Sequence, residues 1–519
     1  MRSVSSRLLM LWLLCVVAGT LAPFGFAADG GEHGLRPLAY GAFERDPVHF
    51  VFNMLLFMPL GGLLYHEARR RSDKVLPVVI LAGMAGLSIS LTIECLQAFL
   101  PTRDSSLIDL LANTVGSMIG VAADRRWGTA AEERLNRMRA GTSPVTLGVL
   151  MGGFLCVALL VSATLQAGTR LSNWDPKYPL LIGNEYTGDR PWRGRVVALD
   201  ITDAATPADA VRRFSAGESV ALPGARIATF AFNGGASYND ASGSLPGLEW
   251  TEPQSAHGQV GVQLAGTSWL QSAGPASELA RRLQKTNAFT LHITCATDDI
   301  DQDGPARIVS NSVSPFLRNF TMGQQGSDLV FRLRTPDTGL NGYPLEIYVP
   351  GVFKDRHVRD ILATYDGATL LVATAHGDAV SSTKLTPGAS LALAIDSLHV
   401  LPDQLDRYEL AYVAALSLIP GGLIGLLGKT IRERRMFSAA WVIAFAVLLE
   451  TTTVGVSGGA FAWADVARTA AVGTAVLAVF NVIFTSANMP WRPSKGARVA
   501  LNAAHWNSSP AEGISGATF

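Results

Sequence analysis

Charged residues are scarce in this sequence, and some motifs that mark common enzymes are missing. Only 16% of the 519 residues are charged, whereas 48% are hydrophobic. The formal net charge is zero, so the composition gives no argument for binding nucleic acid. The sequence contains no P-loop and no H-E-x-x-H motif. Its length allows several domains, and its composition is typical of a chain that is part membrane-embedded and part soluble.

Cysteine is also rare, since the whole sequence contains four. Cys15, Cys95 and Cys156 fall in apolar segments, which leaves Cys295 alone in the polar part of the chain. A disulfide within that polar part is therefore excluded. No C-x-x-C motif and no Cys/His spacing suited to a metal ion is present.

The stretch from residue 46 to residue 124 consists of apolar segments that carry a few polar residues. Each segment is about long enough to cross a bilayer. Glu94, Gln97, Asp109 and Asn113 lie inside these segments or at their ends. Because a carboxylate in hydrocarbon costs about 2.5 kcal/mol or more, such residues are expected to face a protein interior, a wet cavity or the interface.

The spacing of these four residues predicts that they lie close together. On helices, Glu94 and Gln97 share one face, and Asp109 and Asn113 share another. The connector between the two helices is short, so it predicts an antiparallel hairpin with the polar residues at one end. Two interpretations remain open: the polar residues fix helix packing, or they form a site for binding or chemistry.

A third helix is expected to pack against this hairpin. Asn53 lies in the preceding apolar segment and can join the polar residues. Gly116 and Gly120 form a G-x-x-x-G pattern, which lets two membrane helices approach closely.

The segments HFVFNMLLFMPLGG and IECLQAFLPTRDSSLIDLLANTVGSMIG resemble the VanZ family of bacterial membrane proteins. The resemblance covers about residues 46–124, under a fifth of the chain. It implies a membrane protein linked to the cell envelope and to tolerance of glycopeptide antibiotics, and it names no reaction. The positions that match the family pattern are Asn53, Pro59, Glu94, Gln97, Arg103, Asp109 and Asn113.

Apolar runs predict about eight membrane spans. They cover about residues 8–26, 48–65, 75–99, 107–123, 145–166, 408–427, 436–456 and 464–484. The first run follows two arginines and precedes Ala27 and Ala28. It is either an uncleaved first span, which we favour, or a cleaved signal peptide.

The expected fold is therefore a multi-domain chain with an α-helical transmembrane bundle and an all-β domain. Its parts are a first helix and outer loop at 1–45, a VanZ-like three-helix unit at 46–124, a basic loop and fifth span at 125–168, a β domain at 169–405, a three-span bundle at 406–488 and a disordered cytoplasmic tail at 489–519.

The β domain is predicted from short runs with an alternation of period two. Phe289, Leu291 and Ile293 alternate with polar residues, and turn residues separate many such runs. The order of the pieces GVQLAGTSWLQS, NAFTLHI, ARIVSNS, RNFTMGQ and ATYDGATLLVA resembles the laminin-G/concanavalin-like jelly-roll superfamily. Residues 169–246 match less well and are read as accessory strands or a linker.

Basic residues predict the membrane topology. The connectors after the second, fourth and sixth spans are rich in arginine and lysine, as is the tail; Arg69, Arg125 and Arg432 are examples. With eight spans and a cytoplasmic N-terminus, all of them lie inside, as the positive-inside rule requires. Both termini are then cytoplasmic, the protein lies in the bacterial inner membrane, and the jelly roll is periplasmic or extracellular.

The last three spans are predicted to be a degenerate copy of the VanZ-like unit. Glu94 and Asp109 are 15 residues apart, and so are Glu450 and Asp465. Pro59-Leu60-Gly61-Gly62 in the first helix of one group is echoed by Pro420-Gly421-Gly422 in the first helix of the other. The counterparts of Gln97, Arg103 and Asn113 would be Thr453, Gly459 and Thr469. Internal repeats are common in membrane folds, and sites lie at repeat interfaces.

Two features of the β domain bear on ligands. Asp299, Asp301 and Asp303 match the start of a D-x-D-x-D-G calcium loop, but the twelfth position is a serine, so an acidic hairpin tip is the favoured interpretation. Calcium is the only cofactor considered. Four tryptophans are candidates for stacking on sugar rings, although core positions are the favoured interpretation: Trp174, Trp192, Trp250 and Trp269.

The sequence thus favours a non-enzymatic envelope protein in which the jelly roll binds a glycan or a protein partner. Arg103 would contact an anion of a lipid-linked envelope molecule, and Glu94 and Asp109 would accept hydrogen bonds from sugar hydroxyls. The alternative is a membrane transferase or hydrolase that acts on a lipid-linked sugar, with the two carboxylates as general acid and base. Membrane lipids are expected partners, and the oligomeric state is left open.

Overall fold

A computed structural model of the chain describes residues 4–21, 26, 47–100, 106–252, 260–343, 345–377, 380–394, 402–427 and 430–485. The chain forms two compact units. The first comprises Met1–Gly153, Leu416–Trp441 and Gly473–Phe519, and the second comprises Phe154–Ala415 and Val442–Val472. The predicted tail at 489–519, the connector at 101–105 and Ala27–Ala28 lie outside the described residues.

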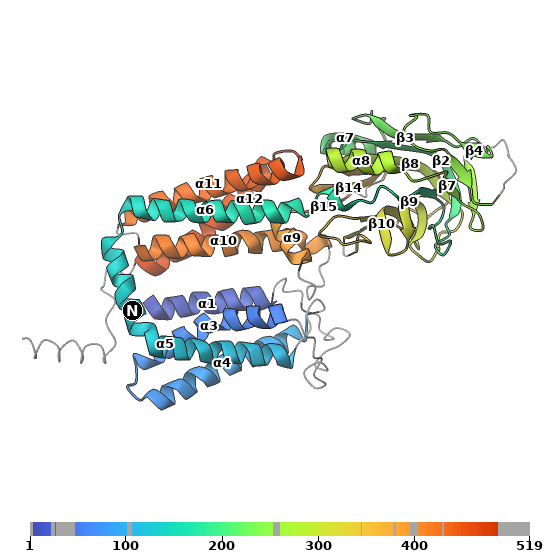
Figure 1. The fold of residues 1–519 in the computed structure, drawn as a ribbon. Coiled ribbons are helices and arrows are strands. Elements are labelled where there is room, and N and C mark those ends of the chain that lie inside the picture. Colours follow the sequence, from blue (N-terminus) through green and yellow to red (C-terminus); the bar gives the residue numbers. More distant parts are fainter. Residues whose placement is uncertain are drawn as a thin grey trace, which may run out of the picture. The chain divides into compact units, whose positions relative to one another are not determined.

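The described part of the first unit is made of helices (Figure 1). These are α1 (Val4–Leu21), α3 (Pro47–Arg69), α4 (Val75–Gln97) and α5 (Leu107–Gly141). Four further helices have one part in each unit: α6 (Pro144–Ala167), α10 (Leu405–Leu427), α11 (Ile431–Ser457) and α12 (Trp463–Thr485).

Six of the helices in the described ranges are long and apolar enough to cross a membrane. They are α4, α5 over Leu107–Ala131, α6, α10, α11 and α12 over Trp463–Phe484, while α1 contributes a shorter apolar helix at Leu8–Leu21. The chain is therefore a multi-pass membrane protein. The predicted count of eight spans would also need α1 and α3.

Helices α3 and α5 pack closely because glycines line their contact. A Cβ atom placed on Gly116 would overlap the carbonyl oxygen of Met54, and one placed on Gly120 would overlap that of Met58. On the other helix, a Cβ atom at Gly61 would overlap the backbone of Ser117. The close approach predicted from the G-x-x-x-G pattern is confirmed, and its partner is α3.

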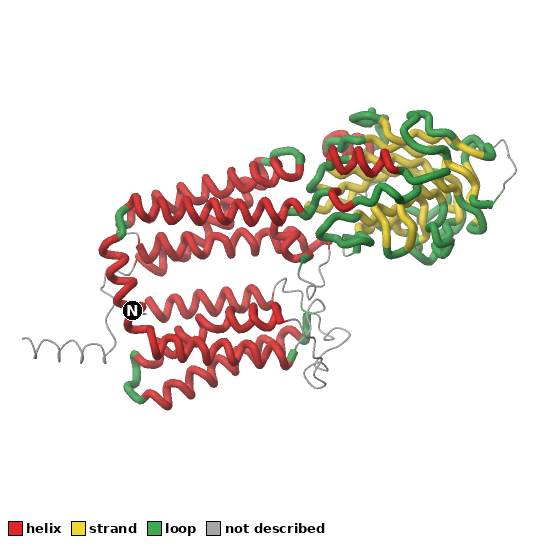
Figure 2. Tube along the Cα trace, viewed as in Figure 1, coloured by secondary structure: helices red, strands yellow, loops and turns green. Residues whose placement is uncertain are grey.

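The second unit contains two antiparallel sheets, whose strands are yellow in Figure 2. The first sheet has the order β12-β11-β10-β9-β1-β7-β5-β4, and the second has the order β15-β14-β13-β8-β2-β3 with β6 beside β2. The strands of the first sheet are β1 (Leu180–Ile182), β4 (Ser237–Tyr238), β5 (Leu248–Trp250), β7 (Leu270–Ser272), β9 (Ala306–Ser314), β10 (Leu317–Gln325), β11 (Asp328–Leu333) and β12 (Glu346–Val349).

The second sheet carries the remaining strands. They are β2 (Arg193–Thr202), β3 (Arg226–Ala231), β6 (Val262–Ala265), β8 (Phe289–Thr297), β13 (Arg359–Tyr365), β14 (Thr369–Thr374) and β15 (Val380–Lys384). Short helical elements accompany the sheets: η1 (Leu171–Asn173), α7 (Ala208–Ser215), α8 (Ser277–Thr286), α9 (Pro387–Leu393) and η2 (Pro402–Gln404). We refer to the two sheets together as the sandwich.

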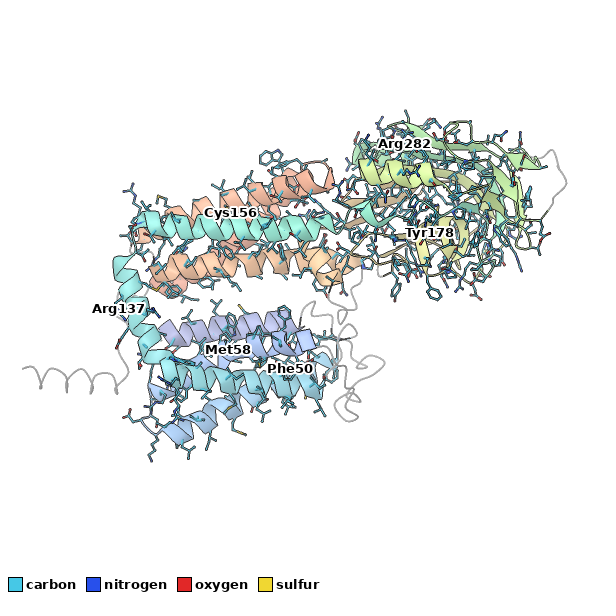
Figure 3. All side chains as sticks on the ribbon, in the orientation of Figure 1. Phe50, Met58, Arg137, Cys156, Tyr178 and Arg282 are labelled. Carbon is cyan, nitrogen blue, oxygen red and sulfur yellow. The ribbon has the colours of Figure 1, made fainter. Side chains whose placement is uncertain are left out.

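One hydrophobic core joins the two sheets. The alternation predicted along β8 is observed, since Phe289, Leu291 and Ile293 are all buried in this core. The ring of Phe289 lies 6.4 Å from that of Phe331, a residue of the opposite sheet. Tyr178 also lies among the strands (Figure 3), and its carbonyl oxygen accepts a hydrogen bond from Asn311. An aromatic core of this size stabilises the packing of the two sheets.

The early part of the β domain corrects one sequence interpretation. Strands β1 and β2 come from residues 169–246, which were read as accessory strands or a linker. Instead β1 pairs with both β7 and β9, and β2 pairs with both β3 and β8. Both strands are therefore interior. The sequence did not reveal this because interior pairing depends on partners that are far away in the chain.

Within the second unit, hydrogen bonds tie the sandwich to helix ends. The guanidinium of Arg170 donates to the carbonyl oxygen of Val456 at 2.7 Å, and the amide of Asn287 donates to that of Ser457 at 2.7 Å. Both acceptors lie in the last turn of α11, where carbonyl groups have no partner within the helix. The sandwich thus satisfies the exposed end of this helix.

Candidate functional site

The polar residues predicted in the VanZ-like unit come together where α3, α4 and α5 meet. Asn53 of α3 donates from Nδ2 to Asp109 Oδ1 of α5 at 2.8 Å. Glu94 is 1% exposed, and its Oε2 accepts the backbone N–H of Ser106 at 2.9 Å. Ser106 is the N-cap of α5, and its hydroxyl accepts the N–H of Ile108. Glu94 and Ser106 therefore fix the start of α5, where backbone donors lack helical partners.

The same group of residues continues along the contact between α4 and α5. Asn113 is 2% exposed and donates to Ser90 at 3.0 Å. One turn further, Ser117 packs against Gly86. We call this line of residues the polar seam: Gly86, Ser90 and Glu94 on α4, and Asp109, Asn113 and Ser117 on α5. The spacing of four residues on each helix keeps them on one face.

Gln97 connects the polar seam to the first helix. Its amide nitrogen donates to the carbonyl oxygen of Thr20 in α1 at 2.9 Å. Six predicted site residues were placed in this region, and the structure brings together five of them: Asn53, Glu94, Gln97, Asp109 and Asn113. Arg103 lies outside the described residues, so its predicted contact with an anion stays a prediction.

The seam contains buried polar atoms that have no hydrogen-bond partner among the described residues. These atoms are Oε1 of Gln97, Oδ1 of Asn113 and Oγ of Ser117. Two are carbonyl oxygens, which only accept hydrogen bonds. Buried polar groups are nearly always satisfied, so these oxygens are suited to water or to a ligand that carries hydroxyl or ammonium donors.

The second pair of acids, Glu450 and Asp465, repeats part of this arrangement in the second unit. Glu450 Oε1 accepts the N–H of Ala462 at 2.9 Å, and Ala462 directly precedes α12. Asp465 forms ion pairs with Lys384 of β15 and with Arg468. A cavity of about 40 Å³ lies beside both acids, and its lining includes Thr453 and Thr469. This volume holds water but no sugar ring.

A larger cavity of about 420 Å³ lies among α1, α3 and α4. Its lining is largely apolar and includes Leu9, Leu64, Pro77 and Leu81. It borders the first turns of α4, whereas Glu94 lies near the end of that helix. The cavity is therefore separate from the charged end of the polar seam.

The aspartates of the D-x-D-x-D-G segment lie in the loop between β8 and β9. Among the residues that the structure describes, no group of three or more His, Cys, Asp or Glu side chains is arranged to hold a metal ion. Asp299 instead accepts the N–H of Asp301 at 3.1 Å and lies 3.8 Å from Arg193. The segment turns back into β9, and nothing brings Asp303 to the other two carboxylates. Calcium stays an untested prediction that this arrangement does not favour.

The tryptophans divide into two groups. Trp174 and Trp192 are at most 2% exposed and donate their indole N–H groups to Arg334 and Gln324 within the sandwich. They are core residues and cannot stack on a ligand. Trp250 and Trp269 are half-buried, and their indole nitrogens are buried without a partner among the described residues.

A G-x-S-x-G pattern at residues 455–459 is structural. Ser457 is 1% exposed and ends α11, and its hydroxyl accepts the N–H of Gly459. A serine nucleophile of this motif sits instead on a turn from a strand to a helix.

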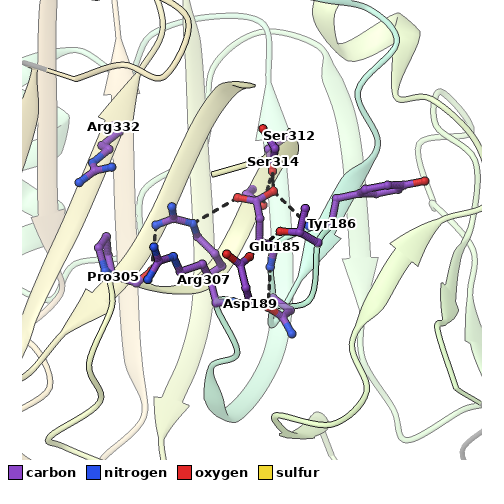
Figure 4. A network of polar contacts seen from close by, with 12 residues as sticks. Glu185, Tyr186, Asp189, Pro305, Arg307, Ser312, Ser314 and Arg332 are labelled. Carbon is purple, nitrogen blue, oxygen red and sulfur yellow. Dashed lines mark hydrogen bonds and ion pairs between the residues drawn. The ribbon is translucent and has the colours of Figure 1, made fainter. Parts of the chain in front are cut away.

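Sequence reasoning missed a polar cluster on one face of the first sheet (Figure 4). Arg307 Nε lies 3.4 Å from Glu185 Oε2, and both side chains are at most 1% exposed. Ser312 donates to the other oxygen of Glu185, and Arg332 donates to Glu346 at 2.7 Å. A signal was present, since ARIVSNS and LRNFTM place an arginine inside an otherwise buried strand, where an unpaired charge is costly.

The fold and the seam together define a class: a multi-pass membrane protein that carries an antiparallel β domain. Residues 9–125 match the model of the VanZ/LLP1 family, so the first part of the chain is a VanZ-like region. The match begins earlier than the predicted boundary at residue 46 and includes α1, in agreement with the bond between Gln97 and Thr20. No curated protein and no solved structure matches the chain.

Proposed function

We propose that this chain is an eight-span protein of the bacterial cytoplasmic membrane with both termini in the cytoplasm. The six apolar helices would be joined by α1 and α3 as further spans. The basic connectors support this topology: Arg71 follows α3, and Arg125 and Arg126 are exposed on the extension of α5. Positive residues are retained on the cytoplasmic side.

The sandwich would then lie outside the membrane. We propose that it is a jelly roll of the laminin-G/concanavalin-like type that binds a glycan or a protein partner of the cell envelope. Support comes from its two antiparallel sheets around one core. Buried ion pairs on a sheet face are costly to desolvate, and this cost supports a role for that face beyond packing.

The polar seam would bind the polar part of a lipid-linked envelope molecule, in keeping with a role in the envelope or in glycopeptide tolerance. The observation that carries this proposal is a group of buried oxygens near Glu94 and Asp109 to which no described residue donates a hydrogen bond. Sugar hydroxyls supply such donors. The apolar cavity among α1, α3 and α4 offers a place for a membrane lipid.

The test compares Asn113→Ala and Glu94→Ala with the wild-type chain in cells that depend on it for tolerance of a glycopeptide antibiotic. We expect both variants to lose far more tolerance than any fall in their abundance in the membrane fraction explains. If abundance falls in step with tolerance, the seam only holds the helices together.

The enzymatic alternative has a separate measurement. Purified protein in detergent would convert a lipid-linked sugar, and Glu94→Gln would stop the conversion. Both carboxylates already accept hydrogen bonds from the chain, Glu94 from Ser106 and Asp109 from Asn53, which supports a binding role over proton transfer.

A further inference from the structure

Arg318 is a buried arginine that forms no ion pair with a residue that the structure describes. Its side chain is 1% exposed, yet Nε and Nη1 have no hydrogen-bond partner among the described residues. The neighbouring arginines differ, because Arg307 pairs with Glu185 and Arg332 pairs with Glu346. A buried charge left without a partner is strongly destabilising, so native structures pair such groups.

The backbone of β10 places Arg318 in the polar cluster. Arg318 lies opposite Ser312 of β9, and a β-bulge follows between Arg318 and Phe320. Directly paired residues share a sheet face, so Arg318 lies on the face of Ser312, whose hydroxyl bonds Glu185. The bulge puts Thr321, three residues further on, on the same face. Strand pairing therefore fixes the position of Arg318 in the sheet.

The electrostatic surroundings of Arg318 favour an anion. Arg307 and Arg332 act on Arg318 as positive charges and Glu185 and Glu346 as negative ones, so these five groups together carry one excess positive charge. Burial, followed by repulsion from Arg307 and Arg332, lowers the pKa of Arg318 to about 9. An anion beside Arg318 would balance the charge and relieve this repulsion.

A second donor without a partner lies on the same face. The hydroxyl of Thr321 is buried and has no hydrogen-bond partner among the described residues. Thr321 is paired with Ser310 on one side and with Arg332 on the other. A guanidinium fork and a hydroxyl are the donors that typically hold a carboxylate or a phosphate.

Exposed aromatic residues stand beside these donors. Tyr343 is 62% exposed, and the guanidinium of Arg332 lies 5.8 Å from its ring centroid. Tyr348 is 46% exposed, and it is influenced electrostatically by Arg332, Glu346 and Tyr343. Exposed tyrosines next to buried charge are suited to contact sugar rings while the charge binds a substituent.

We propose that this face of the sandwich binds an anionic glycan, with Arg318 and Thr321 holding its carboxylate or phosphate and Tyr343 and Tyr348 contacting its rings. This inference rests on the proposed function and adds that the glycan is negatively charged. The turn between β11 and β12, which carries Tyr343, is tied to the strand of Arg318, because the backbone N–H of Arg318 donates to the carbonyl oxygen of Leu340 at 3.1 Å.

The test measures ligand binding to the full-length protein in detergent, with glucuronate, glucose 6-phosphate, glucose and inorganic phosphate at one ionic strength. Wild-type protein should bind one or both charged sugars and be stabilised by them against heat. Arg318→Met should weaken that binding about 10- to 100-fold, the size expected for a hydrogen-bonded charge. Thr321→Val, which keeps the shape of the side chain, should weaken it several-fold.

The matched control is Arg359→Met. This substitution also removes one positive charge, but Arg359 lies on β13 of the other sheet and is paired with Asp355. Charged sugars should therefore bind this variant as they bind wild type. Without ligand, Arg318→Met should unfold at a temperature no lower than wild type, because it removes an unpaired buried charge. If it does not fold, Thr321→Val and Tyr343→Ala provide the same comparison.

Three outcomes would overturn the inference, and they separate it from the proposed function. If glucose binds as tightly as the charged sugars, and Arg318→Met does not change that binding, the sandwich binds a glycan but has no anion site. Stabilisation by inorganic phosphate as strong as that by charged sugars would assign the site to a free anion. If none of the four probes binds, both the proposed glycan binding by the sandwich and the anion site are rejected.

Discussion

In the helix group α3–α5, Glu94 near the end of α4 accepts the backbone N–H of Ser106, which lies 12 residues further along the chain. In the helix group α10–α12, Glu450 of α11 accepts the backbone N–H of Ala462, which also lies 12 residues further along. Asp109 and Asp465 are each the third residue of the helix that follows. The two groups differ in what the aspartate contacts. Asp109 bonds Asn53 of its own helix group, whereas Asp465 pairs with Lys384 of the sandwich.

The interior of the two groups also differs. One and two turns before Glu94 lie Ser90 and Gly86, which belong to the polar seam; the corresponding positions before Glu450 are Ala446 and Val442. We interpret the two groups as copies of one unit. Under this interpretation one copy has a polar interior, whereas in the other Asp465 pairs with Lys384 of the sandwich. A polar seam in a membrane is costly unless it is used.

The largest effect is expected from Gly120→Leu, which attacks the packing found only in the first group. Its side chain would overlap the carbonyl of Met58, so α3 and α5 would have to separate. We expect a loss of about 3 kcal/mol or more and low abundance in the membrane fraction. Gly152→Ala is the control, since a Cβ atom there meets no atom within 4 Å. Normal abundance of Gly120→Leu would contradict the described contact.

Glu450→Ala tests whether the two groups have separate roles. Like Glu94→Ala, it leaves a backbone N–H without its acceptor, and both variants should lose about 1–3 kcal/mol of stability. Only Glu94→Ala should lose the envelope phenotype. The measurement compares antibiotic tolerance of the two variants at matched membrane abundance, and equal loss of tolerance would show that the second group is also a functional site.

Lys384→Met should loosen the sandwich from the helix ends with a smaller effect. The ion pair with Asp465 is about one-fifth exposed, so its loss costs about 1 kcal/mol or less. Limited proteolysis should cut faster near the end of β15, and Lys384→Met combined with Asp465→Asn should add little to either single change. Full additivity of the two changes would mean that the residues act independently.

The smallest effect is a pH response confined to the sandwich. Burial by itself raises the pKa of Asp240, but hydrogen bonds from Ser242, Leu245 and Thr229 outweigh it and hold this pKa below its usual value. The folded pKa is depressed, so the stabilisation is present above about pH 4 and is lost as pH falls through the folded pKa. Acid unfolding followed by tryptophan fluorescence should shift in Asp240→Asn, while the helices should not respond.

Much of the architecture could be predicted from local patterns. Long apolar runs predicted α4, α6 and α11 because hydrocarbon excludes unpaired backbone, so each span has to be one continuous helix. Alternation predicted β8 because successive side chains point to opposite faces. The polar residues of the VanZ-like unit were recognisable for a related reason: a carboxylate in an apolar run stands out.

Contacts between distant residues could not be predicted in this way. Lys384 and Asp465 are 81 residues apart, and Arg307 and Glu185 are 122 residues apart. The local sequence around one partner does not indicate the other, because strand order and helix packing decide which distant residues come into contact. The interior places of β1 and β2 were hidden for the same reason.

The sequence by itself determined which segments are apolar, which alternate, and which acids lie at the ends of helices, because these properties depend on neighbours along the chain. Only the tertiary structure decided what each acid contacts. It gave Asp109 an amide partner and Asp465 a lysine from a strand, and within the described residues it left Arg318 without an ion pair. The partner of a charge is set by which distant segments fold beside it.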